Sequence, residues 1–389
     1  MTKGQTTELV HGDEEPDPRV IRPLTLPVHE STTFVFESAA ELRAYNEGRA
    51  AAYLYSRYAS PTVTAVERAL ARLDNAEGAL LFGSGMAATA STLLAHVKTG
   101  DEVVCAAAIY GGTRHLLTDL LHRLGVTPRF VTLDAFGDPS RLLSDRTKVV
   151  WFESPVNPTL RCIDVRRVAA ACREHGVLSV LDNTFASPVN QQPLALGVDL
   201  AMQSATKYLN GHSDVTAGVV SGRAARLQPI EATRRLLGPV LDPRAAAALG
   251  RGLKTLSLRV TRQNASAHAL AEFLARDHRV NAVCYPGLQT HPDHAIARQQ
   301  MSGFGGVVTF DLGGSLERAE AVYDRLRLIQ RATSLGGVES IVSLPVLTSH
   351  QGWSDDELGE AGISRGMVRV SVGLEDVDDL VADLDQALG

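Results

Sequence analysis

Residues 203–214, "QSATKYLNGHSD", hold one lysine whose surroundings suit covalent chemistry. Lys207 ends an apolar segment and lies between hydroxyl residues, with Ser204 and Thr206 before it. A lysine whose pKa is lowered can act as a nucleophile and as a base, and nearby hydroxyls suit phosphate oxygens. The other interpretation is an ordinary solvated surface lysine, which is the commoner case.

The segment "FGSGMAA" follows an apolar run and opens a helix of small residues. Gly85 and Met86 would then offer bare backbone N–H groups at a helix N-terminus, which favours a phosphate. As G-x-G-x-x-A the segment also matches a dinucleotide fingerprint, but the next apolar run ends in "AAAIYGG" without the acid that a ribose needs. A purely structural tight turn is the third interpretation.

Asp182 stands at the end of the apolar run "VLSVLD", where open α/β sheets bind their ligands. It could hold a protonated ring nitrogen, or it could cap the turn "DNT". A phosphate cradle, an aspartate for a pyridinium nitrogen and a lysine for a Schiff base are together what pyridoxal 5′-phosphate (PLP) requires. The three parts also follow one another along the chain in a consistent order.

The elements that must position these residues read as a doubly wound, mostly parallel α/β domain followed by a smaller one. Helical patterns alternate with β-rich runs between residues 60 and 220, and the last residues form an amphipathic helix. Residues 248–277 predict one long helix or two. We expect an N-terminal arm that contacts a neighbouring subunit, a large cofactor-binding domain and a small C-terminal α/β domain, at residues 1–55, 56–248 and 249–389. The strands are expected within residues 78–82, 101–107, 127–134, 147–154, 177–185, 199–205 and 217–222.

Composition favours a small-molecule role for this chain of 389 residues. A net charge of −6 leaves no basic footprint for nucleic acid or a membrane surface. The four cysteines lack C-x-x-C spacing, so we expect a reducing compartment, and we expect no metal, no membrane span and a cytoplasmic location. Three charged segments are expected at the surface: "RRLLGPVLDPR", the tail "EDVDDLVADLD" and "HPDH", whose H-x-x-H spacing has no third ligand.

"SATKYLNGHSD" resembles the lysine motif of the trans-sulfuration family of PLP enzymes, and the resemblance covers nearly the whole chain after residue 20. It implies fold type I of PLP-dependent transferases. "YSRYASPT" is similar to the family's Y-S-R-x-x-N-P-T, with Ser60 in place of asparagine. That motif implies that Tyr55 and Arg57 reach the cofactor phosphate of a neighbouring copy, in a homotetramer built from dimers that share active sites.

The resemblance assigns further roles, residue by residue. "SGMAA" implies phosphate binding, and "YGGT" implies that Tyr110 stacks on the cofactor ring and carries a proton. "ESPVNPTL" implies that Asn157 contacts the cofactor, with Glu153 in support. "SLGGVES" and "VRVSVGLED" imply that Ser334 and Arg369 bind the substrate carboxylate. The other interpretation of Arg369 is a surface ion pair with Glu375 or Asp376.

The substrate is a sulfur amino acid or a homoserine ester by this resemblance. Family members that act on cystathionine tend to have an acid and a base where this chain has Leu54 and His115, which favours the apolar tail of methionine. Glu339 and the glycine Gly112 point instead toward the cystathionine enzymes. γ-Elimination of methionine is therefore our first expectation, with cystathionine γ-elimination or γ-replacement as alternatives. A nicotinamide-dependent dehydrogenase and a non-catalytic homologue remain as alternatives from other classes.

Overall fold

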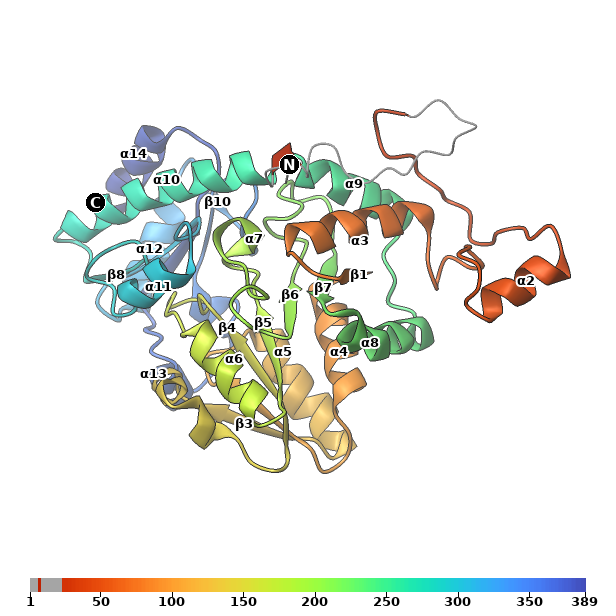
Figure 1. The fold of residues 1–389 in the computed structure, drawn as a ribbon. Coiled ribbons are helices and arrows are strands. Elements are labelled where there is room, and N and C mark those ends of the chain that lie inside the picture. The colour runs from red at the N-terminus through yellow and green to blue at the C-terminus, as the bar shows by residue number, and fades with distance from the viewer. Residues whose placement is uncertain (1–5, 8–22) are drawn as a thin grey trace.

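The computed structural model describes residues 6–7 and 23–389, and its centre is a seven-stranded sheet with helices on both faces (Figure 1). The strand order is β1-β7-β6-β5-β4-β2-β3. β7 pairs antiparallel with β1 and β6, whereas the pairs from β6 to β3 are parallel. The predicted doubly wound, mostly parallel sheet is confirmed. Its strands are β1 (Gly78–Phe82), β2 (Glu102–Ala106), β3 (Thr127–Val131), β4 (Thr147–Glu153), β5 (Leu178–Asp182), β6 (Leu200–Gln203) and β7 (Gly218–Gly222).

The helices bury nearly all residues of the inner strands of this sheet, whereas the edge strand β3 is partly exposed. One face packs on α4, α8 and the π-helical turn at Leu116–Leu121, and the other packs on α3, α6 and α9. Strands covered on both faces must be apolar throughout, which explains runs such as the central residues of β4. The α-helices are α2 (Ala39–Asn46), α3 (Pro61–Leu73), α4 (Gly85–His96), α5 (Gly111–His115), α6 (Val165–Glu174), α7 (Ser187–Asn190), α8 (Ala224–Leu237), α9 (Pro243–Leu253), α10 (Leu256–Arg276), α11 (His294–Gln300), α12 (Leu316–Arg325), α13 (Asp355–Glu360) and α14 (Val377–Leu388).

Helix α6 shows why the sequence folds as it does locally. Asp164 caps its N-terminus by accepting a hydrogen bond from the backbone N–H of Arg167. Val165, Val168 and Cys172 then repeat at helical spacing and are buried against the sheet. The helix ends before Gly176, whose φ of 66° is the left-handed conformation expected of a glycine that follows a helix.

A second sheet has the order β10-β11-β12-β9-β8 and is mostly antiparallel. One face packs on α10, α12 and α14. The other face turns toward the first sheet, and Met367 joins the cluster that contains Val150 and Phe152 of β4. The strands are β8 (Ala282–Cys284), β9 (Val307–Asp311), β10 (Gln330–Arg331), β11 (Ile341–Ser343) and β12 (Met367–Ser371).

Residues 248–277 form parts of two helices rather than one, with a break between α9 and α10. The first turns of α10 bury Leu256 and Val260 in the core that α3 and α9 share. Its later turns bury Leu270 and Leu274 in the core of the second sheet. α10 therefore belongs to both cores, and the predicted boundary at residues 248/249 falls inside α9.

Three expectations of surface position are wrong at particular residues. Arg234 is buried because Glu67 pairs with its guanidinium at 2.6 Å. Asp383 of the acidic tail helix is buried because its carboxylate accepts hydrogen bonds from three successive backbone N–H groups, those of residues 327–329. Asp293 in the "HPDH" loop is buried against Arg161, at 2.6 Å. In each case a partner distant in sequence offsets the cost of burying a charge.

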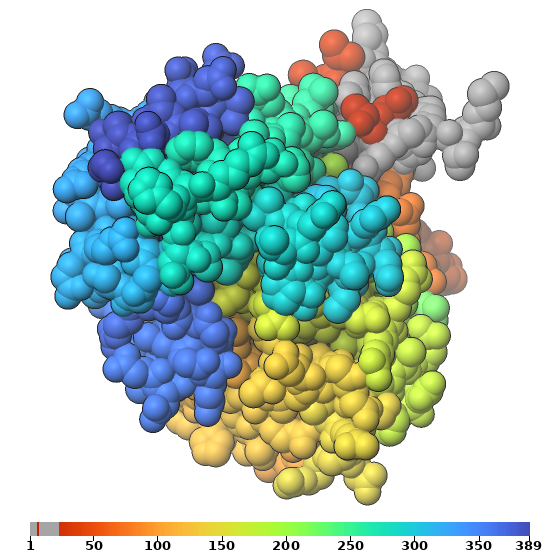
Figure 2. Space-filling view, turned by 90° about the vertical axis from the view of Figure 1, so that its left-hand side faces the viewer, coloured from red at the N-terminus to blue at the C-terminus, as the bar shows by residue number. Residues whose placement is uncertain are grey.

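The segment that includes α11 lies against the first sheet's layer, and Figure 2 shows it in cyan resting on the yellow surface below. Gln300 at the end of α11 accepts a hydrogen bond from the backbone N–H of Val165 and donates one to the carbonyl of Ile163. With the bond from Arg161 to Asp293, these contacts tie the residues that follow β4 to the second half of the chain.

No helix among the described residues has the length and apolar character needed to span a bilayer. Within the same residues, no cluster of three or more histidine, cysteine or acidic side chains is arranged to hold a metal ion.

Candidate active site

Lys207 lies in the turn that follows β6, and its amine contacts a residue more than a hundred positions away. The Nζ atom donates a hydrogen bond of 2.6 Å to the hydroxyl of Ser334. Burial, and then the nearby charge of Arg369, lower the pKa of Lys207 to about 8. A larger fraction of this amine is neutral near neutral pH than for an ordinary lysine, as a nucleophile or base requires.

Arg369 projects from the middle of β12 and is buried. Its Nη1 atom donates to the side-chain oxygen of Asn157 at 2.7 Å, and its Nη2 atom donates to the backbone oxygen of Ser334 at 3.0 Å. Burial lowers its pKa to about 10. Glu375 instead accepts hydrogen bonds from Ser340, so the surface ion pair with Glu375 is excluded. A buried guanidinium held by neutral groups is suited to a carboxylate ligand.

Two buried acids stand side by side where β4 and β5 end. Glu153 and Asp182 are partners in the strand register. Burial, and then the charge of Asp182, raise the pKa of Glu153 to about 8, and burial also raises the pKa of Asp182. Asp182 accepts the N–H of Thr184 at 3.0 Å, and Glu153 accepts the N–H of Tyr110 at 2.7 Å. Such a pair favours a cationic neighbour, because a positive charge would let the acids ionise.

The N-terminus of α4 faces the residues before Lys207. Ser84 caps the helix by accepting the N–H of Ala87 at 3.0 Å. The N–H groups of Gly85 and Met86 have no partner within the helix, as in any first turn. A Cβ on Gly85 would lie only 3.0 Å from the Cβ of Ser204, so the helix start and Ser204 lie side by side on one surface. This surface has the donors that a phosphate needs.

Tyr110 immediately precedes α5, and its ring lies over the start of that helix. A Cβ on Gly112 would lie 2.6 Å from the ring edge of Tyr110 and 2.8 Å from the sulfur of Met86. Tyr110 is therefore close to the first turn of α4. The residue is 46% exposed, so it remains accessible to a ligand.

These residues fit PLP. The start of α4 with Ser204 would bind the phosphate, Asp182 would pair with the ring nitrogen, and Lys207 would bond to the aldehyde carbon. Thr206 fits the phosphate less directly. Its hydroxyl donates to the backbone oxygen of Ala217 at 3.2 Å and accepts the N–H of the same residue at 2.9 Å. The single proton of that hydroxyl is already used within the turn.

Three predicted residues lie apart from this cluster within the chain. Arg57 donates to the backbone oxygen of Arg235, and its guanidinium lies 5.6 Å from the ring centre of Tyr55. His115 is exposed and pairs with Asp119 at 3.3 Å on the same helical stretch. These contacts are with Arg235, between Arg57 and Tyr55 themselves, and with Asp119, rather than with Lys207.

The two remaining substrate candidates are partly accessible. Leu54 is half-buried, and its backbone oxygen accepts the N–H of Phe34 at 3.3 Å. Glu339 is exposed and accepts a hydrogen bond of 3.3 Å from Ser213, six residues after Lys207. Glu339 thus contacts the segment that carries the lysine.

Sequence reasoning missed two residues that support the site. The hydroxyl of Thr184 accepts the N–H of Ser204 at 2.8 Å, while its own N–H binds Asp182, so it links the acid to the phosphate cradle. Arg259 lies on the buried face of α10 beneath the turn that carries Lys207. The signal in the sequence was that Arg259 lies three residues after Leu256 and four before Gln263. This spacing places it on the same buried face of the helix as those two residues.

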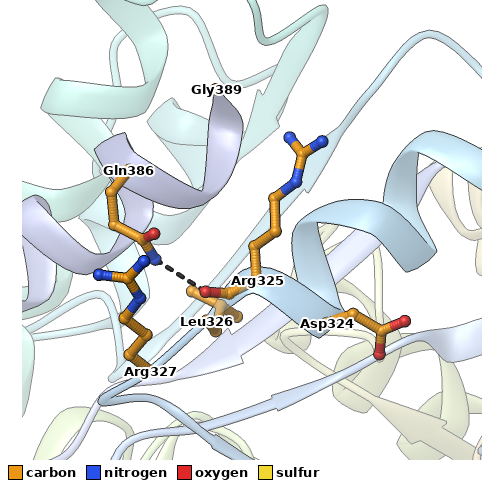
Figure 3. A pocket seen from close by; sticks show the side chains of 6 residues that line it. All are labelled: Asp324, Arg325, Leu326, Arg327, Gln386 and Gly389. Carbon is orange, nitrogen blue, oxygen red and sulfur yellow. Dashed lines mark hydrogen bonds between the residues drawn. The ribbon is translucent and has the colours of Figure 1, made fainter.

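A hollow of about 540 Å³ lies at the ends of α12 and α14 (Figure 3). It is lined by Asp324, Arg325, Leu326, Arg327, Gln386 and Gly389. The amide of Gln386 already donates to the backbone oxygen of Arg325 at 2.9 Å. None of the six belongs to the cluster around Lys207, so this hollow is separate from the candidate active site.

Comparisons with known proteins agree with this geometry. Residues 6–389 match the family "Cys/Met metabolism PLP-dependent enzyme". The chain is 42% identical to L-methionine gamma-lyase of Pseudomonas putida, over 94% of this chain and 92% of that one. It is 42% identical to cystathionine gamma-synthase 1, chloroplastic, of Nicotiana tabacum, over 94% of this chain and 68% of that one. It is 38% identical to cystathionine gamma-lyase of Homo sapiens, over 98% and 93%.

A crystal structure of metB from Corynebacterium glutamicum superposes with a TM-score of 0.93 at 36% identity, covering 100% of this chain and 98% of that one. The α/β architecture is therefore that of the fold type I PLP enzymes, as expected. The match spans both sheets, so it includes every element that carries a residue of the candidate site. The chain belongs to the Cys/Met metabolism family of PLP-dependent enzymes.

Proposed function

We propose that this chain is a carbon–sulfur lyase that converts L-methionine and water to methanethiol, 2-oxobutyrate and ammonia by γ-elimination. The observation that carries the proposal is that one residue, Ser334, binds both Lys207 through its hydroxyl and Arg369 through its backbone oxygen. An α-amino acid has its amine and carboxylate on the same carbon. Groups that react with the amine and bind the carboxylate must therefore lie this close together.

PLP, when bound, supplies an electron sink for negative charge at the substrate's Cα. Arg369 binds the substrate carboxylate with a planar pair of N–H groups, and Asn157 orients that guanidinium. Lys207 removes the proton at Cα, because its lowered pKa gives it a neutral amine. The same amine can take a proton from Cβ only after the first proton has left it for the electron sink that PLP would supply. Tyr110, at the open side of the site, donates a proton to the departing sulfur.

Two groups of residues would bind the cofactor. Within one copy, Gly85, Met86, Ser204 and Thr206 bind the phosphate, and Asp182 binds the ring nitrogen. Tyr55 and Arg57 contribute to the site of a second copy, in a cytoplasmic homotetramer of site-sharing dimers. The arm at residues 1–55, which ends at Tyr55, would also contact that second copy, although residues 1–5 and 8–22 lie outside the described part of the chain.

Leu54 and His115 support methionine as the substrate. Neither is an acid that could pair with the distal ammonium group of cystathionine, and burying an unpaired charge is costly. Glu339 supports a second candidate. Its exposed carboxylate beside Ser213 could meet that ammonium group, which would make the protein a cystathionine γ-lyase or a γ-replacement enzyme such as a cystathionine γ-synthase or a homoserine-ester sulfhydrylase.

Release of 2-oxobutyrate by the PLP-loaded protein, with L-methionine and L-cystathionine assayed side by side, separates these candidates. We expect faster turnover of methionine. Faster turnover of cystathionine would transfer the proposal to the γ-lyase. Release from neither, with activity on an activated homoserine ester plus a thiol, would establish γ-replacement.

A second experiment tests the site itself. Borohydride should fix PLP onto the protein, and peptide mass spectrometry should locate the adduct at Lys207. An adduct at another lysine, or a protein that takes up no cofactor, would contradict the proposal.

A further inference from the structure

Arg259 is a buried guanidinium whose hydrogen bonds go to neutral oxygens. Its side chain is on α10, and the residue is 3% exposed. Nη1 donates to the backbone oxygen of Tyr208 at 2.8 Å, and Nη2 donates to those of Gly252 at 2.9 Å and Leu209 at 3.4 Å. Nε donates to the hydroxyl of Thr255 at 3.0 Å. Among the described residues, no carboxylate pairs with this guanidinium.

Two of these oxygens belong to the residues that directly follow Lys207. That segment is neither a strand nor an α-helix, and most of its backbone bonds are short-range; a longer-range bond runs from the N–H of Val338 to the carbonyl of Gly211 at 3.0 Å. Lys207 donates its N–H to Ser204 at 3.1 Å, and Gly211 donates to Lys207 at 2.8 Å. Buried carbonyl groups that accept no hydrogen bond from within such a turn need donors from elsewhere in the chain. Arg259 supplies them from a different part of the chain.

The contact between Arg259 and the turn is tight. Gly211 has a φ of 72°, and a Cβ at this position would lie 1.9 Å from Nη1 of Arg259. A side chain other than glycine would therefore displace either the guanidinium or the turn. Gly211 is four residues from Lys207, so the guanidinium is packed directly on the backbone that orients the lysine.

The planar guanidinium of Arg259 makes a set of hydrogen bonds that no other side chain, charged or neutral, could make from this position. Burial of a cation without a counter-ion is costly, and burial lowers the pKa of Arg259 to about 10. The guanidinium offsets that cost by donating in several directions from one rigid plane, including toward the C-terminal end of α9 at Gly252. Lysine has one nitrogen at the end of a flexible stem, so it cannot reach the same set of oxygens together.

We propose that Arg259 is a positioning residue for Lys207, because it anchors the backbone of residues 208–211 from α10. The inference rests on the proposed role of Lys207 as the residue that bonds to the cofactor. The Nζ atom of Lys207 reaches Ser334 at 2.6 Å, and a small displacement of the turn would lengthen that contact. Loss of the anchor would slow the reactions of the amine without touching the cofactor or the substrate.

The test compares Arg259 with a matched buried arginine. Arg234 is also 3% exposed and also lies on a helix, but it binds Glu67 and the backbone oxygen of Leu81. The variants are Arg259→Lys, Arg259→Met, Arg234→Lys and Arg234→Met. Both arginines contribute to stability, so all four variants should have lower melting temperatures. The lysine variants retain a positive charge, which keeps the comparison available if a methionine variant does not fold.

Two readouts distinguish positioning from general stability. The first is amide hydrogen exchange of residues 208–211 in the cofactor-free protein. The second is the rate at which added PLP is trapped on Lys207 by borohydride, with the adduct located by peptide mass spectrometry. For the Arg259 variants we expect exchange at least tenfold faster and trapping about tenfold slower than in the unmodified protein. For the Arg234 variants we expect the exchange rate and the trapping rate to stay within about twofold of those of the unmodified protein.

Equal effects in the two pairs, or no effect in the Arg259 pair, would overturn the inference. Trapping at another lysine in the unmodified protein would overturn the proposed role of Lys207 instead. The exchange data would still decide whether Arg259 anchors the turn, so the two failures are distinguishable.

Discussion

Ser334 combines a strained backbone with contacts to two charged side chains. Its φ of 100° is a conformation that residues other than glycine rarely adopt. Strain of this kind costs about 1–3 kcal/mol and persists where the surroundings enforce it. Here Lys207 binds the hydroxyl and Arg369 binds the backbone oxygen of the same residue. The backbone conformation is therefore part of how the two cations are placed.

A pair of substitutions separates the two properties of Ser334. Glycine relieves the strain and removes the hydroxyl, whereas alanine removes the hydroxyl and keeps the strain. We expect Ser334→Gly to be more stable than Ser334→Ala by about 1 kcal/mol in urea unfolding. Both should show reduced PLP-dependent activity, because both lose the acceptor for Lys207. Equal stability of the two variants would contradict the role assigned to strain.

Arg369 yields a second prediction for a single side chain. Arg369→Lys keeps the charge but loses the planar pair of N–H groups, so one nitrogen must replace the bonds to Asn157, Ser334 and the substrate carboxylate. A cost of about 2–4 kcal/mol corresponds to a fall of roughly 30- to 1000-fold in kcat/KM. Arg262→Lys is a suitable control, since Arg262 pairs with Asp376 at the surface. An unchanged kcat/KM for Arg369→Lys would contradict its proposed role as the carboxylate ligand.

Among the elements, the C-terminus of α3 and the end of β6 are joined through a buried acid. Asp74 ends α3 and is 1% exposed, and both its oxygens lie 3.3 Å from the amide nitrogen of Gln203. Burial raises the pKa of Asp74 from its usual 3.8 to about 7. Between those two values the folded protein holds a proton that the unfolded chain has released. The stability contributed by the protonated form is thus present below pH 4 and is lost as pH rises through about 7.

Replacement of this acid by its amide should remove the pH dependence. We expect Asp74→Asn to be more stable than the unmodified protein by roughly 1–3 kcal/mol at pH 8, with little difference at pH 4. Urea unfolding at both pH values measures this. Asp242→Asn, at the exposed cap of α9, is the control and should show no such gain. A destabilised Asp74→Asn at pH 8 would show that the ionised acid is tolerated.

The sequence was most informative where one element decides its own structure. Strand β4 could be predicted from its apolar run, and helix α6 from its helical spacing and the capping residue Asp164. Lys207 could be identified from its motif and Asp182 from its position at the end of an apolar run. The contact between Asn157 and Arg369 could not be predicted in this way. It joins residues 212 positions apart, and the packing of the two sheets decides it.

The direction of a strand and the burial of a charged side chain were harder to predict from the sequence than the presence of a helix or strand. The run that forms β7 does not reveal that the strand is antiparallel to both neighbours, because a short apolar strand reads alike in either direction. The buried state of Arg234 depends on Glu67, which lies in a different helix. The division at residues 248/249 and the roles of Tyr55 and Arg57 stay predictions.

For the whole molecule, an apolar surface beside Arg57 is left exposed by the residues that the structure describes. Leu236 is 82% exposed and Leu237 is 57% exposed at the end of α8, and Tyr55 is 38% exposed. Arg57 binds the backbone of Arg235 in the same place. Figure 1 shows that the segment with α2 extends away from the sheets on this side. A second copy that uses Tyr55 and Arg57 would cover this surface.

Mixing two inactive variants tests that arrangement. Arg57→Ala would lack a phosphate ligand for its neighbour, and Lys207→Ala would lack its own amine. If sites are shared, a hybrid dimer has one site with both defects and one intact site. After co-expression or refolding of equal amounts, we expect roughly a quarter of the unmodified activity, because half of the dimers are hybrids with one intact site each. No recovery, with hybrids confirmed by mass spectrometry, would contradict site sharing.

Helix α10 has a consequence for the way the protein unfolds. It spans roughly 31 Å, and its two ends are buried in different cores. Melting of either core would expose apolar residues of this one helix and release the anchor beneath Lys207. The two halves of the chain are therefore thermodynamically coupled, and heating should give a single cooperative transition in calorimetry rather than two separate ones.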